Sequence, residues 1–177
     1  MSNTPTPEDL AVIQNQLGRT PRDVHAISYR CPCGNPAVVA TPPRLSDGTP
    51  FPTFYYATCP KLTGAISTLE SSGLMAQMNE RLQSDAKLAG DYLAAHVDYE
   101  AARSAVAKQV NLDVPEIKGV TAGGMPDRVK CLHSLIAHAL AAGSDVNPLG
   151  DEALIALESW WLTKPCSEIS NLLGEEK

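Results

Sequence analysis

The residues of this sequence best suited to metal or thiol chemistry are its five cysteines: Cys31, Cys33, Cys59, Cys131 and Cys166. None of them forms a CxxC pair. Because zinc ribbons and fingers normally contain two such short-spaced pairs, the linear spacing is only a weak indication of a metal site. The alternative is that the cysteines are small buried apolar side chains, as unpaired cysteines often are.

The dipeptides Cys31-Pro32 and Cys59-Pro60 are identical, and Pro165-Cys166 is their inverse. A proline beside a ligand restrains the backbone, and Cys-Pro also occurs at iron–sulfur ligands. The first hypothesis is therefore a cysteine-ligated metal site. Its predicted ligands are Cys31, Cys59, Cys131 and Cys166, with His133 and Cys33 as less favoured members. Four thiolates suit zinc or a 4Fe–4S cluster, whereas a histidine ligand would favour zinc.

The periodicity of residues 126–142 predicts a helix that carries one of these cysteines. On such a helix Cys131 and His133 lie about 160° apart, because successive residues turn by about 100°. They could share a metal ion only if the helix began later. Otherwise His133 and His138 are ordinary hydrogen-bonded histidines at the margin of the core.

The stretch "GGMPDRVK" suggests a second kind of site in front of this helix. Gly124, Arg128 and Lys130 could hold an anion at the helix N-terminus, although the spacing is not that of a P-loop. The second hypothesis is therefore an enzyme that binds an anionic, phosphorylated substrate there and uses Cys131 as a thiol. Alternatively, Arg128 pairs with a carboxylate or extends into water.

The β-rich runs and helical periodicities that surround these residues in the sequence predict an α+β fold. Three β-rich runs at 24–30, 36–45 and 51–59 are separated by turn signals, which indicates a three-stranded antiparallel meander. In a meander the first and third strands run parallel. Cys31 and Cys59, which close those two strands, should therefore lie at the same edge of the sheet.

Four to six helices are expected around this sheet. Thr6, Pro7 and Asp9 form the start signal of a first helix that Gly18 can close. Two short helices broken at Gly73 follow the meander, and a long amphipathic helix covers 86–109. A single domain is predicted over 1–177, with a peripheral N-terminal helix in 1–21, the β meander in 24–60, a helical part in 61–165 and a frayed tail in 167–177.

The composition restricts the classes of partner. The chain has 14 Lys and Arg against 20 Asp and Glu, which argues against an extended nucleic-acid surface. No stretch resembles a signal peptide or a membrane span, so we expect a cytoplasmic protein whose cysteines are not paired as disulfides. A phosphate-containing small molecule or another protein is the expected partner. A third hypothesis is a non-catalytic interaction module that uses the helix at 86–109 as its partner surface.

Three blocks of the sequence together, "RCPCGNPAVV", "DGTPFPTFYYATCP" and "GGMPDRVKCLHSLIAHALAAG", resemble a bacterial family. The chain is similar, over about residues 22–166, to the domain-of-unknown-function family numbered five hundred and one, in its actinobacterial form. The family has no known activity that the resemblance could assign to this chain. It covers the following positions: Arg30, Cys31, Gly34, Pro36, Phe51, Pro52, Thr53, Thr58, Cys59, Pro60, Lys130, Cys131, Leu132, His133, Ala137 and His138. Relatives often carry another residue in place of Cys33, which makes it the weakest ligand candidate.

The same resemblance implies a physiological setting. Genes of this family tend to lie near those of an exopolyphosphatase-like phosphatase and a septum-formation initiator. The resemblance therefore links the chain to cell-envelope or division physiology.

Overall fold

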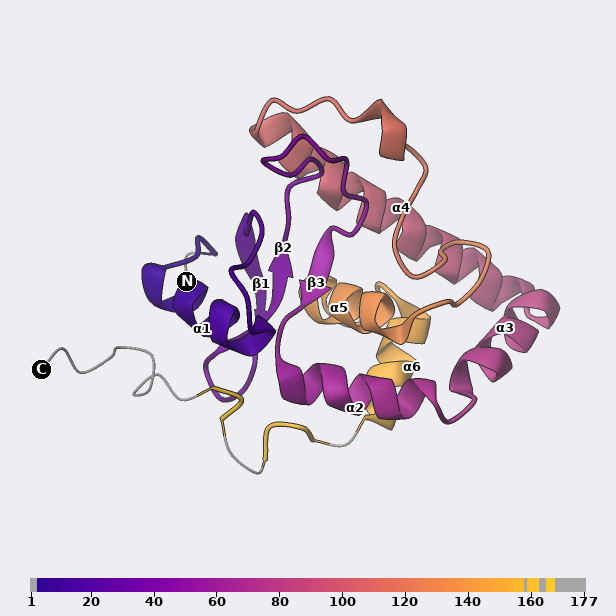
Figure 1. Ribbon diagram of the computed structural model, residues 1–177. Coiled ribbons are helices and arrows are strands. Elements are labelled where there is room, and N and C mark those ends of the chain that lie inside the picture. Colours follow the sequence, from indigo (N-terminus) through magenta and orange to yellow (C-terminus); the bar gives the residue numbers. More distant parts are fainter. Residues whose placement is uncertain (1–2, 158, 163–164, 168–177) are drawn as a thin grey trace, which may run out of the picture.

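The computed structural model describes residues 3–157, 159–162 and 165–167, and it has the expected α+β fold (Figure 1). Residues 168–177 of the predicted tail lie outside the described residues. The elements in chain order are α1 (Pro7–Leu17), β1 (Ala26–Arg30), β2 (Pro36–Ala40), β3 (Tyr55–Ala57), α2 (Pro60–Glu70), α3 (Leu74–Ser84), α4 (Ala86–Gln109), the 3-10 turn η1 (Pro115–Ile117), α5 (Leu132–Ala142) and α6 (Pro148–Ala156).

The sheet is the predicted antiparallel meander, with strand order β1-β2-β3. Its strands are shorter than the β-rich runs of the sequence. After Ala40 the chain makes one isolated bridge, between Arg44 and Pro50, and then returns to β3. Pro42 and Pro43 lie in this connection, where their missing N–H groups cost no ladder bonds. The C-terminal ends of β1 and β3 lie at the same end of the sheet, because both strands run antiparallel to β2.

Both faces of the sheet are covered, which explains why all five residues of β2 are buried. On one face Ile13 of α1 packs against Ile27 and Val39. On the other face α5 lies against the sheet, and the ring of Tyr55 stacks on that of His138 at a centroid distance of 5.7 Å. Figure 1 shows α1 on one side of the strands and α5 on the other.

The first helix begins and ends as its sequence signals predict. Thr6 and Asp9 form a reciprocal capping box, and Gly18 adopts the left-handed conformation at the end. Asp9 also accepts two hydrogen bonds from Arg30, at 2.7 and 2.9 Å, which attaches α1 to β1. Ile13 is fully buried, and α1 thereby covers one face of the sheet.

The middle helices also follow the sequence pattern. Gly73 separates α2 from α3, and α4 has the predicted bounds. One face of α4 buries Tyr92 and Tyr99 completely. On its outer face Leu93 and Val97 are exposed, and they do not extend into the long apolar stripe that an interaction helix would need.

The start of α5 differs from the prediction, because the helix begins at Leu132 and not at 126. Asn79 makes two hydrogen bonds to the backbone of Val129, one to its N–H at 2.8 Å and one to its carbonyl at 2.9 Å. The N–H of Lys130 donates to the carbonyl of Gly123 at 2.7 Å. These bonds hold the backbone before residue 132 out of the helical path.

Helix α6 crosses α5 at very short range. Gly150 makes this possible, because a Cβ atom at this position would lie 2.5 Å from the carbonyl oxygen of Leu135. Asn147 caps α6 by accepting from the N–H of Gly150 at 2.9 Å. The same asparagine donates to Nδ1 of His138 at 3.2 Å, so the cap of one helix holds a buried side chain of the other.

Candidate metal and thiol sites

Four of the five cysteines meet near the end of the sheet where β1 and β3 terminate. We call Cys31, Cys33, Cys59 and Cys166 the thiol cluster. The sulfur atoms of Cys33 and Cys166 are 3.8 Å apart. Cys166 also interacts with Cys59, and Cys31 with Cys33, closely enough to shift the pKa of the thiols. Cys31 and Cys59 are buried, and all four side chains are free thiols.

Local backbone geometry aims N–H groups at two of these sulfur atoms. Cys59 is the N-cap residue of α2, and the N–H groups of Lys61 and Leu62 act to lower the pKa of its thiol. In the turn after β1 the N–H of Cys33 donates to the sulfur of Cys31. Donors of this kind stabilise negative charge on sulfur, which is the form that binds metal ions.

Cys166 is the member of the cluster with the most anionic character. It accepts hydrogen bonds from Cys59, from Nε2 of Gln16 at 3.3 Å and from Nδ2 of Asn35 at 3.7 Å. These bonds, that from Cys59 first, lower the pKa of the Cys166 thiol to about 5 despite its burial. The same contact and burial raise the pKa of Cys59. Burial likewise raises the pKa of Cys31.

The fifth cysteine belongs to a separate group, formed with residues of α2 and α5. We call Glu70, Cys131 and His133 the Cys131 triad. One donor atom from each lies within 4.8 Å of the other two, and within the described part of the chain this is the one group of three metal-binding donors that meets this condition. The triad could hold a metal ion. In the thiol cluster, whose four residues the structure describes, no three sulfur atoms lie within 4.8 Å of one another. These sulfur atoms are therefore spread more widely than sulfur atoms around a bound zinc ion.

Hydrogen bonds restrict the protonation of His133. Its Nε2 atom lies 3.3 Å from the carbonyl oxygen of Thr63, which can only accept, so Nε2 donates. Its Nδ1 atom lies 3.2 Å from Oε1 of Glu70. A neutral imidazole has no second proton for that contact. The ring is therefore either a doubly protonated imidazolium or a ligand whose Nδ1 atom faces a cation.

The electrostatics of the triad favour the imidazolium. The hydrogen bond with Cys131, assisted by Glu70, raises the pKa of His133 to about 9 although burial opposes this. Burial would raise the pKa of the Cys131 thiol, but bonds from His133 and the N–H of Ser134 outweigh it and lower that pKa. Cys131 also caps α5, where the helix dipole favours a negative charge.

A cleft of about 490 Å³ opens beside this triad. Residues of α1, β3 and the beginnings of α2 and α5 line it, among them Tyr55, Tyr56, Cys131 and His133. Thr58, which is 2% exposed, also lines the cleft, and its buried hydroxyl has no hydrogen-bond partner among the described residues.

The predicted metal ligands divide between the two groups. Cys31, Cys59 and Cys166 lie in the thiol cluster together with Cys33, the least favoured candidate, whereas Cys131 lies in the triad with His133. Because α5 begins at Leu132, Cys131 and His133 are not separated by a regular helical turn and come into contact, as a later helix start would allow. His138, which was expected to be an ordinary hydrogen-bonded histidine, is fully buried and donates to Asp98 at 2.9 Å.

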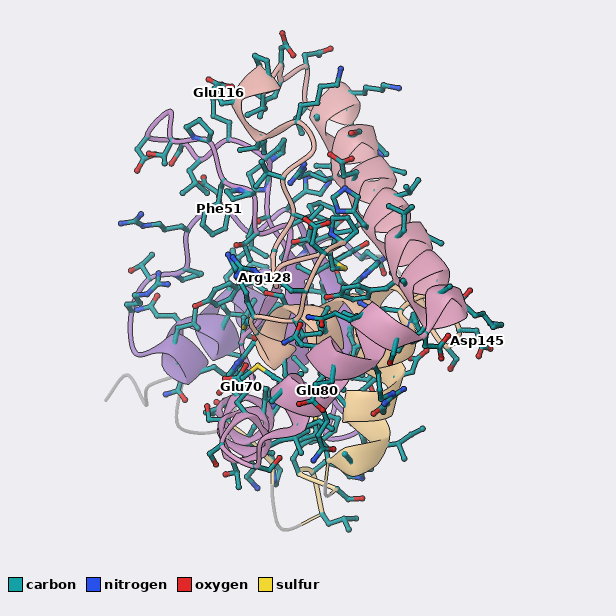
Figure 2. The ribbon with its side chains drawn as sticks, turned by 90° about the vertical axis from the view of Figure 1, so that its right-hand side faces the viewer. Phe51, Glu70, Glu80, Glu116, Arg128 and Asp145 are labelled. Carbon is teal, nitrogen blue, oxygen red and sulfur yellow. The ribbon has the colours of Figure 1, made fainter. Side chains whose placement is uncertain are left out.

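The predicted anion-binding residues lie in the loop before α5 and not at a helix N-terminus. Gly124 has a φ of +95°, and a Cβ atom there would lie 2.6 Å from the carbonyl oxygen of Arg128, so glycine is needed for the backbone itself. The side chains of Arg128 and Lys130 are exposed. In Figure 2 Arg128 lies in this loop and Glu70 near the end of α2. Anion binding at this loop stays a prediction.

Sequence reasoning missed three residues of these sites. Asn35 directly follows the "CPCG" turn, a position from which an amide can reach the turn's sulfur atoms, and this signal was available. Gln16 and Glu70 carry no such signal, because each reaches its cysteine only through the packing of helices on the sheet.

Fold and sites together define an α+β protein with two separate thiol-bearing sites. The family model described as a protein of unknown function, DUF501, matches residues 27–155, and the chain belongs to this family. This confirms the resemblance found in the sequence. Searches of curated proteins and of solved structures found no match. No helix in the described part of the chain is both long and apolar enough to cross a bilayer.

Proposed function

We propose that the protein is a zinc-binding domain whose metal site is the thiol cluster. The observation that carries the proposal is the convergence of four thiols from three separate parts of the chain, with backbone N–H groups directed at two of the sulfur atoms. A four-thiolate tetrahedral shell is the usual structural zinc site. In this role the metal would join the sheet, α2 and the segment around Cys166.

Hydrogen-bond accounting favours the thiol cluster over the Cys131 triad as the metal site. In the triad, Glu70 accepts from the N–H of Leu132 at 2.7 Å and from His133, and His133 uses both ring nitrogens. The triad is therefore satisfied without a cation. In the thiol cluster the one sulfur–sulfur contact with a measured distance joins Cys33 and Cys166, and sulfur is a weak hydrogen-bonding group.

The distance between the sulfur atoms of Cys33 and Cys166 favours zinc over an iron–sulfur cluster. Four sulfur ligands about 2.3 Å from one zinc ion stand about 3.8 Å from each other. The separation of 3.8 Å between Cys33 and Cys166 equals this value, and the wider pairs would have to contract. A 4Fe–4S cluster holds its cysteine sulfurs further apart, around a cube of iron and sulfide.

The proposal includes a reducing location. Free thiols persist in the cytoplasm, where a zinc site keeps them from oxidation, and we therefore place the protein there. Two kinds of partner are proposed. One is a phosphate-containing small molecule bound at Gly124, Arg128 and Lys130, and the other is another protein. The suggested link to envelope or division physiology rests on the family resemblance alone.

The proposal is tested by elemental analysis of protein purified under reducing conditions. We expect one zinc ion per chain in the wild type. Replacing Cys59 or Cys166 by serine removes one ligand, and we expect zinc affinity to fall by at least ten-fold.

The matched control is the replacement of Cys131 by serine, because this cysteine lies outside the thiol cluster. We expect the Cys131→Ser protein to keep its zinc. Absence of metal from the wild type, or loss of zinc in Cys131→Ser with retention in Cys166→Ser, would overturn the proposal. Iron and sulfide with a brown colour would replace zinc by an iron–sulfur cluster.

A further inference from the structure

We propose that Cys131 is the nucleophile of an acyl-transfer site in the cleft between α1, β3, α2 and α5, with His133 as its proton donor and acceptor and Glu70 as a positioning residue. This activity goes beyond zinc binding and does not depend on it.

The triad has the connectivity that a cysteine nucleophile needs. One donor atom of Cys131 lies within 4.8 Å of one of His133 and one of Glu70, and Nδ1 of His133 contacts Oε1 of Glu70 at 3.2 Å. Thr63 fixes the other face of the imidazole by accepting from Nε2. A nucleophile, a base and a group that can orient the base are thus grouped at one place.

Access to substrate distinguishes Cys131 from a packing cysteine. Both Cys131 and His133 line the cleft of about 490 Å³, and neither is fully buried. The cysteine also occupies the N-cap of α5, an eleven-residue helix whose first-turn N–H groups can stabilise negative charge that develops on a substrate oxygen.

The lining of the cleft indicates an uncharged substrate. Among the described residues that line it, His133 and Cys131 are the ones that carry charge, and the others are aromatic, apolar or neutral polar. Thr58 offers a buried hydroxyl without a partner, and Oε1 of Gln16 is likewise buried without one in the described structure. An uncharged acyl ester suits this lining, with its acyl chain against Tyr55 and Tyr56.

The proposed reaction has two steps. The Cys131 thiolate attacks the carbonyl carbon of the ester, a C–S bond forms and the C–O bond to the leaving group breaks. The leaving alkoxide takes the proton of the His133 imidazolium. In the second step His133 accepts a proton from water as the resulting hydroxide attacks the thioester, the acid is released and the thiolate–imidazolium pair is restored.

The probe is p-nitrophenyl acetate, a neutral ester, applied to the full zinc-loaded chain. We expect a burst of about one nitrophenol per chain and one acetyl group on Cys131 by mass spectrometry. The burst should disappear in Cys131→Ser. It should slow by about 100-fold in His133→Asn, because general acid–base assistance is typically of this size or larger.

Two measurements separate this role from a structural one. The control variant His25→Asn removes a histidine that does not line the cleft, and it should keep the wild-type burst. Glu70→Gln should retain the burst but move the alkaline limb of its pH profile to lower pH. Zinc content is measured in every variant, so that a failure of the metal proposal and a failure of this one are told apart.

Three results would overturn the proposal. They are acetylation of Cys131 no faster than that of N-acetylcysteine, equal bursts in the wild type and in His133→Asn, and a second zinc ion per chain that is lost in Cys131→Ser. The last result would make the triad a metal centre.

Discussion

At the scale of single residues, two histidines of α5 lie in opposite electrostatic surroundings. His133 stands beside the thiol of Cys131 and the carboxylate of Glu70, and these two groups, the thiol first, raise its pKa to about 9. His138 is fully buried, and burial lowers its pKa below 6.5 despite the carboxylate of Asp98. Asn147 donates to Nδ1 of His138, so the proton of the neutral ring is on Nε2.

This contrast can be measured by ¹⁵N NMR of the two imidazoles. At pH 7.5 we expect His133 to be doubly protonated and His138 to be neutral with its proton on Nε2. The carboxylate of Glu70 and the thiolate stabilise the charge on the first, and burial excludes it from the second. A His133 ring that titrates near its ordinary pKa of 6.5, or whose Nδ1 atom never takes a proton, would contradict the thiolate–imidazolium pair.

The signs of the two contributions to stability follow from linkage. The raised pKa of His133 adds to the free energy of unfolding fully below pH 6.5, and this contribution is lost as pH rises through about 9. The lowered pKa of His138 acts in the other direction. Its unfolded form takes up a proton first, so stability falls as pH decreases below about 6.5.

At the scale of elements, Arg103 of α4 anchors two loops, the connection before β3 and the segment around η1. Its side chain is 4% exposed. It donates to the carbonyl oxygens of Pro52 at 3.1 Å, Ile117 at 2.8 Å and Val120 at 2.5 Å. One helix thereby fixes both the connection before β3 and the chain after η1.

Replacing Arg103 by methionine should lower the free energy of unfolding by about 2–4 kcal/mol. Methionine keeps the apolar stem but leaves carbonyl groups without donors, and each such loss costs about 1–3 kcal/mol. Urea denaturation measures the change. Arg81→Met is the control, because Arg81 pairs with Glu152 at the surface and such pairs contribute about 0–1 kcal/mol. Equal losses in the two variants would refute the anchoring role.

The elements that could be predicted from sequence are those with local signals. The capping box at Thr6, the break at Gly73 and the periodicity of 86–109 each correspond to a boundary in the structure. The start of α5 could not be predicted, because Asn79, fifty residues earlier, sets the backbone at Val129. Arg103 carries no local signal, since its partners are carbonyl groups of two distant loops.

At the scale of the whole molecule, topology brings the cysteines together. The meander places Cys31 and Cys59 at one edge of the sheet, which the strand order allowed us to predict. Cys166 arrives there from the other end of the chain, where the neighbouring Ser167 is bonded through its carbonyl to Asn35 at 2.8 Å and through its hydroxyl to Asn15 at 3.1 Å. The separation of Cys131 from this group was not predictable, because it depends on how α5 packs on α2.

The measurement that tests the central claim most directly is X-ray absorption at the zinc edge of the purified wild-type chain. Zinc in the thiol cluster predicts a first shell of four sulfur atoms at about 2.3 Å, with no nitrogen or oxygen ligand. A first shell that mixes one sulfur with nitrogen and oxygen would place the metal at Glu70, Cys131 and His133. That result would contradict the account of both sites.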